Sequence, residues 1–347
     1  MKLKIILPLI CILSASSMLG CNGKEESAYY QGVAAVENGD YATAETLFDQ
    51  VVSSGQNVKL AYRGEGIAYL ADGNYVKAID LLTNALHESN GLIENADIDT
   101  AYYLAVAQYK AGQIDEAVKT LDSIVAIRPS SDTAFYLRGK IKLLKNDKVG
   151  AMADYDKVVE LLPDNYEHYI RICEDLREAG FKDEGNNYIN KAISLGGKMS
   201  DGVRGQLEYY QGNFTQARNS LENAKKGKDS ETVTLFLGRT YEALGDVDYA
   251  INIYQEAINS YPTSGRLYNQ LASTKMSQGD YQGAIDVIEQ GIENGNGDSL
   301  QNLMYTRIVA YEYLCDFKTA TGYMEEYINQ YPGDASAERE YIFLKSR

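Results

Sequence analysis

The clearest alternation of hydrophobic and polar positions runs from Ser131 to Pro163. Apolar residues recur there at helical spacing in two segments, which predicts two amphipathic helices joined by a polar turn at Asn146–Asp147. Small residues, Gly139 and Ala151, stand where the two helices would cross, and Pro163 ends the unit because proline cannot continue a helix. The bulk of the contact is expected from Phe135, Leu143 and Tyr155.

The same plan recurs along nearly the whole chain, at intervals of 32 to 39 residues. A small residue marks the second helix of each unit: Ala44, Ala78, Ala117, Ala151, Gly185, Ala217, Ala250, Ala284 and Ala320. Twelve residues earlier the first helix carries a small side chain in every unit but the last, which has Ile308. Four residues after each marker comes a large apolar residue on the same helix face. Four prolines each lie twelve residues after a marker: Pro129, Pro163, Pro262 and Pro332.

With these positions in register, residues 28–332 resemble nine tetratricopeptide repeats, which are helix–turn–helix units of about 34 residues. The resemblance implies an all-α fold, a right-handed α-solenoid in which each repeat contacts only its neighbours. Residues 333–347 are expected to form a C-terminal capping helix with Ala337, Tyr341 and Leu344 on its apolar stripe. An insertion within His87–Asp97 separates the second and third repeats.

The N-terminus has the pattern of an export signal. Lys2 and Lys4 precede an apolar run over Ile5–Leu13, which is too short to span a membrane. The next segment, Ser17-Met18-Leu19-Gly20-Cys21-Asn22, resembles the lipobox of bacterial lipoproteins. The resemblance implies that residues 1–20 are removed, that Cys21 is lipidated and that residues 21–27 tether the repeats to a membrane. The alternative is an ordinary signal peptide followed by a chance cysteine.

These features predict a protein outside the cytoplasm, anchored either to the cell membrane or to an outer membrane. The chain has 49 acidic and 33 basic residues, a formal net charge of −16 at pH 7. Such a chain is repelled by nucleic acid and by anionic lipid headgroups, so we expect no nucleic-acid partner. Tyrosine is frequent, at 29 residues, which is typical of half-buried helix positions with a wet hydroxyl.

No motif for catalysis or for a cofactor stands out. Gly196-Gly197-Lys198 lacks the spacing of a phosphate-binding loop, and Asn294–Asp298 lacks the carboxylates of a calcium loop. His87 and His168 are far apart and are expected on helix surfaces, and Cys173 and Cys315 lie four repeats apart. We therefore expect neither an enzyme, nor a metal site, nor a small-molecule cofactor.

In tetratricopeptide proteins the first helices line a concave surface that binds peptides. The corresponding positions predict a binding face of tyrosines and basic residues: Tyr29, Arg63, Tyr102, Tyr136, Lys140 and Arg171. We expect a protein or peptide ligand there, an extended acidic or aromatic segment. The alternative is that the tyrosines pack between first helices and the basic residues pair with local acids. The Lys and Asn set with which some family members hold a C-terminal carboxylate is missing.

The sequence thus favours a non-catalytic adaptor or scaffold for protein complexes of the cell envelope. A receptor lipoprotein that binds peptide or glycan, for sensing or uptake, is the alternative.

Overall fold

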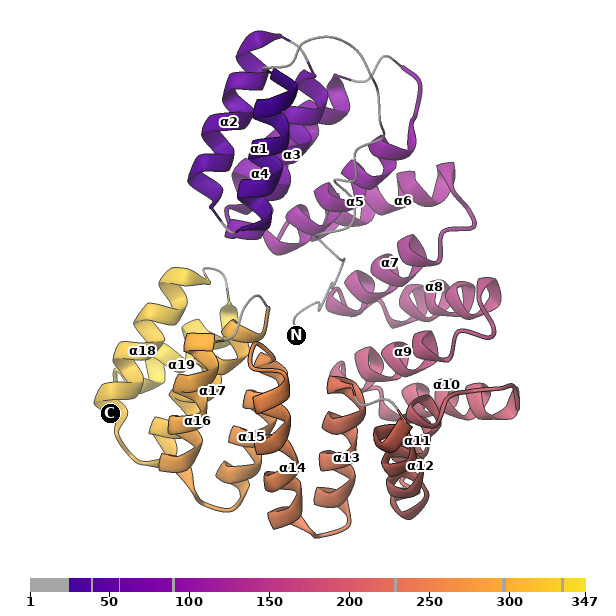
Figure 1. Cartoon of the computed structure of the whole chain (residues 1–347), viewed down its shortest axis with the longest axis vertical. Helices are drawn as coiled ribbons and strands as arrows, with labels where there is room; N and C mark the ends of the chain where they lie inside the picture. Colours follow the sequence, from indigo (N-terminus) through magenta and orange to yellow (C-terminus); the bar gives the residue numbers. More distant parts are fainter. Residues whose placement is uncertain are drawn as a thin grey trace. The chain divides into compact units, whose positions relative to one another are not determined.

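The computed structural model describes residues 25–38, 40–55, 57–88, 91–227, 230–294, 298–331 and 334–347. The predicted signal peptide, Cys21 and Pro332 lie outside these residues. The described residues form 19 α-helices and no strand, which confirms the all-α prediction (Figure 1).

The helices follow one another with short connections. Their bounds are α1 Glu25–Glu37, α2 Tyr41–Ser54, α3 Val58–Asp72, α4 Tyr75–His87, α5 Asn95–Lys110, α6 Ile114–Ile127, α7 Asp132–Leu144, α8 Lys148–Leu161, α9 Tyr166–Glu178, α10 Lys182–Ser194, α11 Asp201–Gln211, α12 Phe214–Gly227, α13 Glu231–Ala243, α14 Val247–Ser260, α15 Gly265–Ser277, α16 Tyr281–Asn294, α17 Asp298–Tyr313, α18 Phe317–Gln330 and α19 Ala335–Leu344.

These helices divide between two compact units. The first holds the described residues up to Pro163, with Glu178–Gly180, and contains α1 to α8. In it each helix packs against the next one along the chain, and α3 also contacts α1 and α5. The second holds Asp164–Arg177 and Phe181–Arg347, and from α10 to α19 its helices likewise pack in chain order. Within each unit this is the neighbour-on-neighbour packing of a repeat array.

The small residues are needed where the two helices of a repeat cross. A Cβ added to Gly139 would lie 3.0 Å from Tyr155 Cε1 and 3.1 Å from the carbonyl oxygen of Ala151. The alanine markers of the second helices are fully buried, as expected for a close helix approach: Ala44, Ala78, Ala117, Ala151, Ala217, Ala250, Ala284 and Ala320.

The turn inside a repeat needs one residue in the left-handed conformation. Gly73 and Gly279 supply it with φ of 86° and 78°. The fourth and ninth repeats have no glycine there, and Asn146 and Cys315 adopt the same conformation with φ of 59° and 58°. The turn geometry is therefore kept even where the residue type changes.

Helix ends account for the two irregular parts of the array. The insertion before the third repeat is closed by a capping box, in which Asp97 Oδ2 accepts a hydrogen bond of 2.8 Å from the Glu94 N–H. At the C-terminus, α19 buries Ala337 and Leu344 and exposes Arg339, as expected for a capping helix, but it also exposes Ile342 and Phe343.

The general expectation of half-buried tyrosines and the expectation for one histidine were wrong, whereas Tyr155 packs at the helix crossing as predicted. Several tyrosines are wholly buried, including Tyr155 and Tyr254, because the glycines opposite them, Gly139 and Gly238, leave room for a ring. His168, expected on a surface, is only 7% exposed. The reason is that a first helix in an array is covered on several sides, and α9 buries eight of its residues.

Candidate functional site

The structure divides the predicted binding residues between the two units. Tyr29, Arg63, Tyr102, Tyr136 and Lys140 lie on α1, α3, α5 and α7 of the first unit. Arg171 lies on α9 in the second unit, where it is exposed. The binding face is therefore described from the first five residues alone.

Arg63 lies near two tyrosines of the neighbouring first helices, Tyr29 and Tyr103. The Arg63 guanidinium lies 5.8 Å from the centroid of the Tyr103 ring on α5. On the side of α1, Tyr29 is half-buried and its ring contacts Phe48 at a centroid distance of 5.9 Å. Burial raises the pKa of Tyr29, and the nearby positive charge of Arg63 offsets part of that rise. Arg63 thus lies close to tyrosines from both neighbouring first helices.

Arg63 itself is buried without a carboxylate. The residue is 5% exposed, and its Nε is a buried donor with no hydrogen-bond partner. Among the described residues we find no ion pair or hydrogen bond that involves its guanidinium. Burying a charge is costly unless it is paired, so this arrangement leaves a cation whose hydrogen-bonding capacity is unused.

Two other arginines with low exposure, Arg138 and Arg307, pair with carboxylates. Arg138 on α7 donates from Nη2 to Asp154 Oδ1 at 2.5 Å and from Nη1 to Asp122 Oδ1 at 2.8 Å. Arg307 on α17 pairs with carboxylates in the same manner, and its guanidinium lies 3.6 Å from the centroid of an aromatic ring, that of Tyr323. Both charges are neutralised inside the protein, whereas that of Arg63 is not.

The remaining predicted residues of the first unit are buried. The Tyr102 hydroxyl shares a hydrogen bond with Ser131, the residue that caps α7. The Tyr136 ring lies 5.9 Å from that of Tyr155 on α8, and Lys140 is 7% exposed. Tyr102 and Tyr136 therefore hold neighbouring helices together, which supports the packing interpretation for these two rings.

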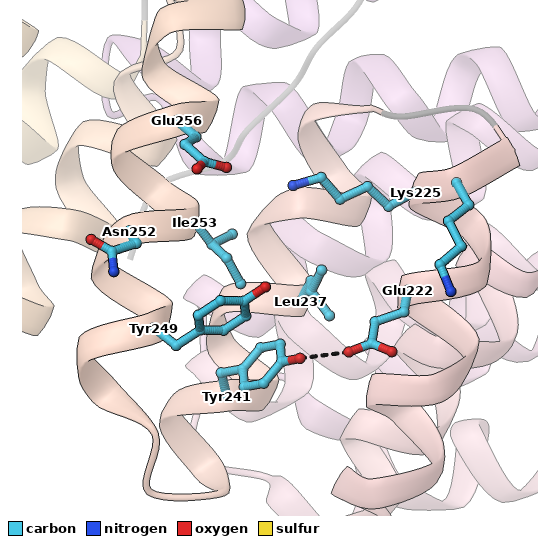
Figure 2. A pocket seen from close by; sticks show the side chains of 9 residues that line it. Glu222, Lys225, Leu237, Tyr241, Tyr249, Asn252, Ile253 and Glu256 are labelled. Atoms are coloured by element: carbon cyan, nitrogen blue, oxygen red, sulfur yellow. Dashed lines mark hydrogen bonds between the residues drawn. The ribbon is translucent and has the colours of Figure 1, made fainter.

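A second feature lies in the second unit, where α12, α13 and α14 line a pocket of about 450 Å³ (Figure 2). Glu222, Tyr241 and Glu256 are among its polar lining residues, and Leu237 and Ile253 form apolar wall. The Tyr241 hydroxyl donates to Glu222 Oε1 at 2.5 Å. Figure 2 shows this bond on one side of the pocket and Glu256 away from it, on α14.

Sequence reasoning missed both Tyr103 and this pocket. Tyr103 follows the predicted Tyr102 directly, and only the helix rotation shows which ring meets Arg63. The pocket lining comes from three helices, so no short motif marks it. The available signal was a register position thirteen residues before each second-helix marker, where three repeats have Arg138, Arg204 and Arg307 and the seventh has Leu237.

Chemistry elsewhere is limited in the part of the chain that the structure describes. No group of three or more His, Cys, Asp or Glu side chains there could hold a metal ion. Cys173 is buried at a helix crossing, and burial raises the pKa of its thiol to about 12. No helix in the described ranges combines the length and apolar character of a membrane span.

Comparison with known proteins agrees with the helix pairs. Four family models, each described as a tetratricopeptide repeat, match residues 29–92, 69–141, 237–264 and 265–294. A tetratricopeptide repeat protein from Parabacteroides merdae is 15% identical, with a TM-score of 0.47, covering 83% of this chain and 99% of that chain. MamA from Desulfovibrio magneticus RS-1 is 17% identical, with a TM-score of 0.43, covering 51% and 97%. The chain therefore contains tetratricopeptide repeats, over residues 29–141 and 237–294.

Proposed function

We propose that this protein is a membrane-anchored, extracytoplasmic lipoprotein whose repeats act as a non-catalytic adaptor for protein partners in the cell envelope. Tetratricopeptide repeats generally mediate protein–protein interactions. The lipobox-like segment around Cys21, behind a Lys-flanked apolar run, supports the anchor.

Arg63 carries the proposal for partner binding. Its guanidinium is buried between tyrosines of neighbouring first helices, and no carboxylate among the described residues neutralises it. A carboxylate from a partner would recover the hydrogen bonds that the buried cation lacks, and bidentate pairing with arginine would orient that partner. We infer that the partner offers an extended segment with an acidic side chain.

Binding of acidic peptides to the purified full chain tests this role. We expect Arg63→Met to weaken that binding at least about tenfold, as loss of a charge-assisted hydrogen bond would. The melting temperature should not fall, because methionine fills similar space without an unpaired charge. Truncation of Tyr102 or Tyr136 would be less informative, because both rings pack between helices.

Arg204→Met on α11 is the matched control, since Arg204 is exposed. Acidic peptides that bind wild-type and Arg63→Met protein equally would contradict the proposed site. A glycan array measured with the same protein separates the adaptor from the glycan-binding alternative.

A further inference from the structure

The pocket of the second unit becomes informative when the repeats are compared at one register position. Arg138 and Arg307 stand thirteen residues before the markers Ala151 and Ala320. Each reaches carboxylates on two second helices, that of its own repeat and that of the preceding one. In these two repeats the position holds a guanidinium that bridges adjacent second helices. The sixth repeat also has an arginine there, Arg204, which is exposed, and the third, fifth, seventh and eighth repeats have Leu104, Ile172, Leu237 and Leu271.

Leu237 occupies this position in the repeat formed by α13 and α14, thirteen residues before Ala250. The carboxylates that would receive an arginine are nevertheless present. Glu222 lies five residues after the marker of the preceding repeat, as Glu289 does, and Glu256 lies six residues after its own marker, as Glu326 does. Both glutamates line the pocket, together with Leu237.

The pocket therefore lies where two other repeats place a guanidinium. Leucine is shorter than arginine and carries no donor, so the space and the acceptors are left to another group. Leu237 and Ile253 are buried, and Figure 2 shows them between Glu222 and Glu256, which lie on different helices.

Aromatic rings complete the resemblance to the Arg307 site. There the guanidinium lies over the Tyr323 ring. In the pocket, Tyr241 and Tyr249 pack edge to face with centroids 4.5 Å apart, and Tyr249 is 48% exposed. A planar, weakly hydrated guanidinium stacks on such rings better than an ammonium does.

Lys225 and Lys226 also line the pocket and favour a different, anionic ligand. Within the described residues neither lysine forms an ion pair with Glu222 or Glu256. The glutamates consequently keep acceptors for a ligand, whereas the two lysines repel a cation and attract an anion. The experiment must separate these two occupants.

We propose that this pocket is a binding site for an arginine side chain of a protein partner, received by Glu222 and Glu256 over the ring of Tyr241 or Tyr249. The site uses no residue of the Arg63 face, so it goes beyond the proposed function and can fail independently of it.

The test uses the purified full chain and three capped tripeptides, Gly-Arg-Gly, Gly-Lys-Gly and Gly-Glu-Gly, followed by saturation-transfer NMR. We expect the arginine peptide to bind best. Glu256→Gln should weaken it about tenfold, the usual effect of losing a charged acceptor. Leu237→Arg should abolish binding, because its own guanidinium would occupy the pocket, while the protein stays folded.

Glu293→Gln on α16 is the matched control, since Glu293 is exposed and does not line the pocket. If Leu237→Arg does not fold, Glu256→Gln still decides the question. Equal binding by wild-type and Glu256→Gln protein, or no binding of the arginine peptide, would overturn the proposal. So would preferred binding of the glutamate peptide that Lys225→Met abolishes.

Discussion

At the scale of single residues, one register position shows how the side chain determines the charge pairing between two adjacent repeats. Thirteen residues before the second-helix marker, Arg138 and Arg307 each join two carboxylates. In the second repeat the same position holds Glu65, whose pKa is raised by burial and in part by the charge of Asp49 on the preceding second helix. In the seventh it holds Leu237, which lines a pocket. The backbone plan is shared, and the charge differs.

Glu65 should make stability depend on pH near neutrality. Burial, followed by the charge of Asp49, raises its pKa from 4.5 to about 7. The folded state then holds a proton that the unfolded state releases above pH 4.5, so this contribution to stability falls as pH rises toward about 7. Glu65→Gln should remove this pH dependence. Its free energy of unfolding should therefore increase relative to that of wild type as the pH rises.

Urea midpoints of both proteins, measured from about pH 5 to about pH 8, check this prediction. Glu293→Gln, which alters an exposed carboxyl group, should follow wild type throughout. A wild-type to Glu65→Gln difference that stays constant over the whole range would show that Glu65 does not titrate there.

At the scale of helices, the crossing of a repeat depends on small residues at two points. The spacing predicted both, and the structure shows why, since a Cβ at Gly139 would contact the backbone of α8 as well as the Tyr155 ring. Backbone atoms cannot move aside as a flexible side chain can. The crossing therefore tolerates little added volume.

Gly139→Leu should separate α7 from α8 and lower the free energy of unfolding by roughly 1–3 kcal/mol or more, the usual cost of overpacking. Gly322 in α18 offers a matched comparison, because a Cβ there meets nothing within 4 Å. Gly322→Ala should raise stability by about 0.5–1 kcal/mol through helix propensity. Chemical denaturation measures both, and a Gly139→Leu protein as stable as wild type would contradict the crossing geometry.

At the scale of the whole molecule, the fold of the repeats and the proposed membrane anchor depend on different residues. The repeats bury their own apolar faces within each unit, whereas attachment to a membrane is proposed to rest on Cys21 alone. The packing of the described helices does not involve Cys21, and the proposed lipidation of Cys21 does not involve the residues of the repeats. A change at Cys21 should therefore alter location without altering the fold of the repeats.

Cys21→Ser should release the protein from membranes and remove the mass of the attached lipid, with unchanged helical content. Cell fractionation, mass spectrometry and circular dichroism measure the three effects. Cys315→Ser is the control, because Cys315 lies exposed in a turn of the ninth repeat. A Cys21→Ser protein that stays membrane-bound at unchanged mass would refute the lipoprotein assignment.

The sequence by itself determined the helix pairs, their crossings and their turns. Each of these rests on local spacing: small residues twelve apart, a large residue four later, and a proline that ends four of the units. Even the exceptions follow locally, since Asn146 and Cys315 replace glycine at a single turn position.

Only the tertiary structure decided which side chains meet. Whether a guanidinium finds a carboxylate depends on the neighbouring repeat, so Arg138 is paired and Arg63 is not. The same holds for the choice of Tyr103 over Tyr102 as the ring beside Arg63, and for the pocket around Leu237. Charge pairing and cavities arise between helices that lie more than a dozen residues apart, where sequence spacing no longer specifies distance.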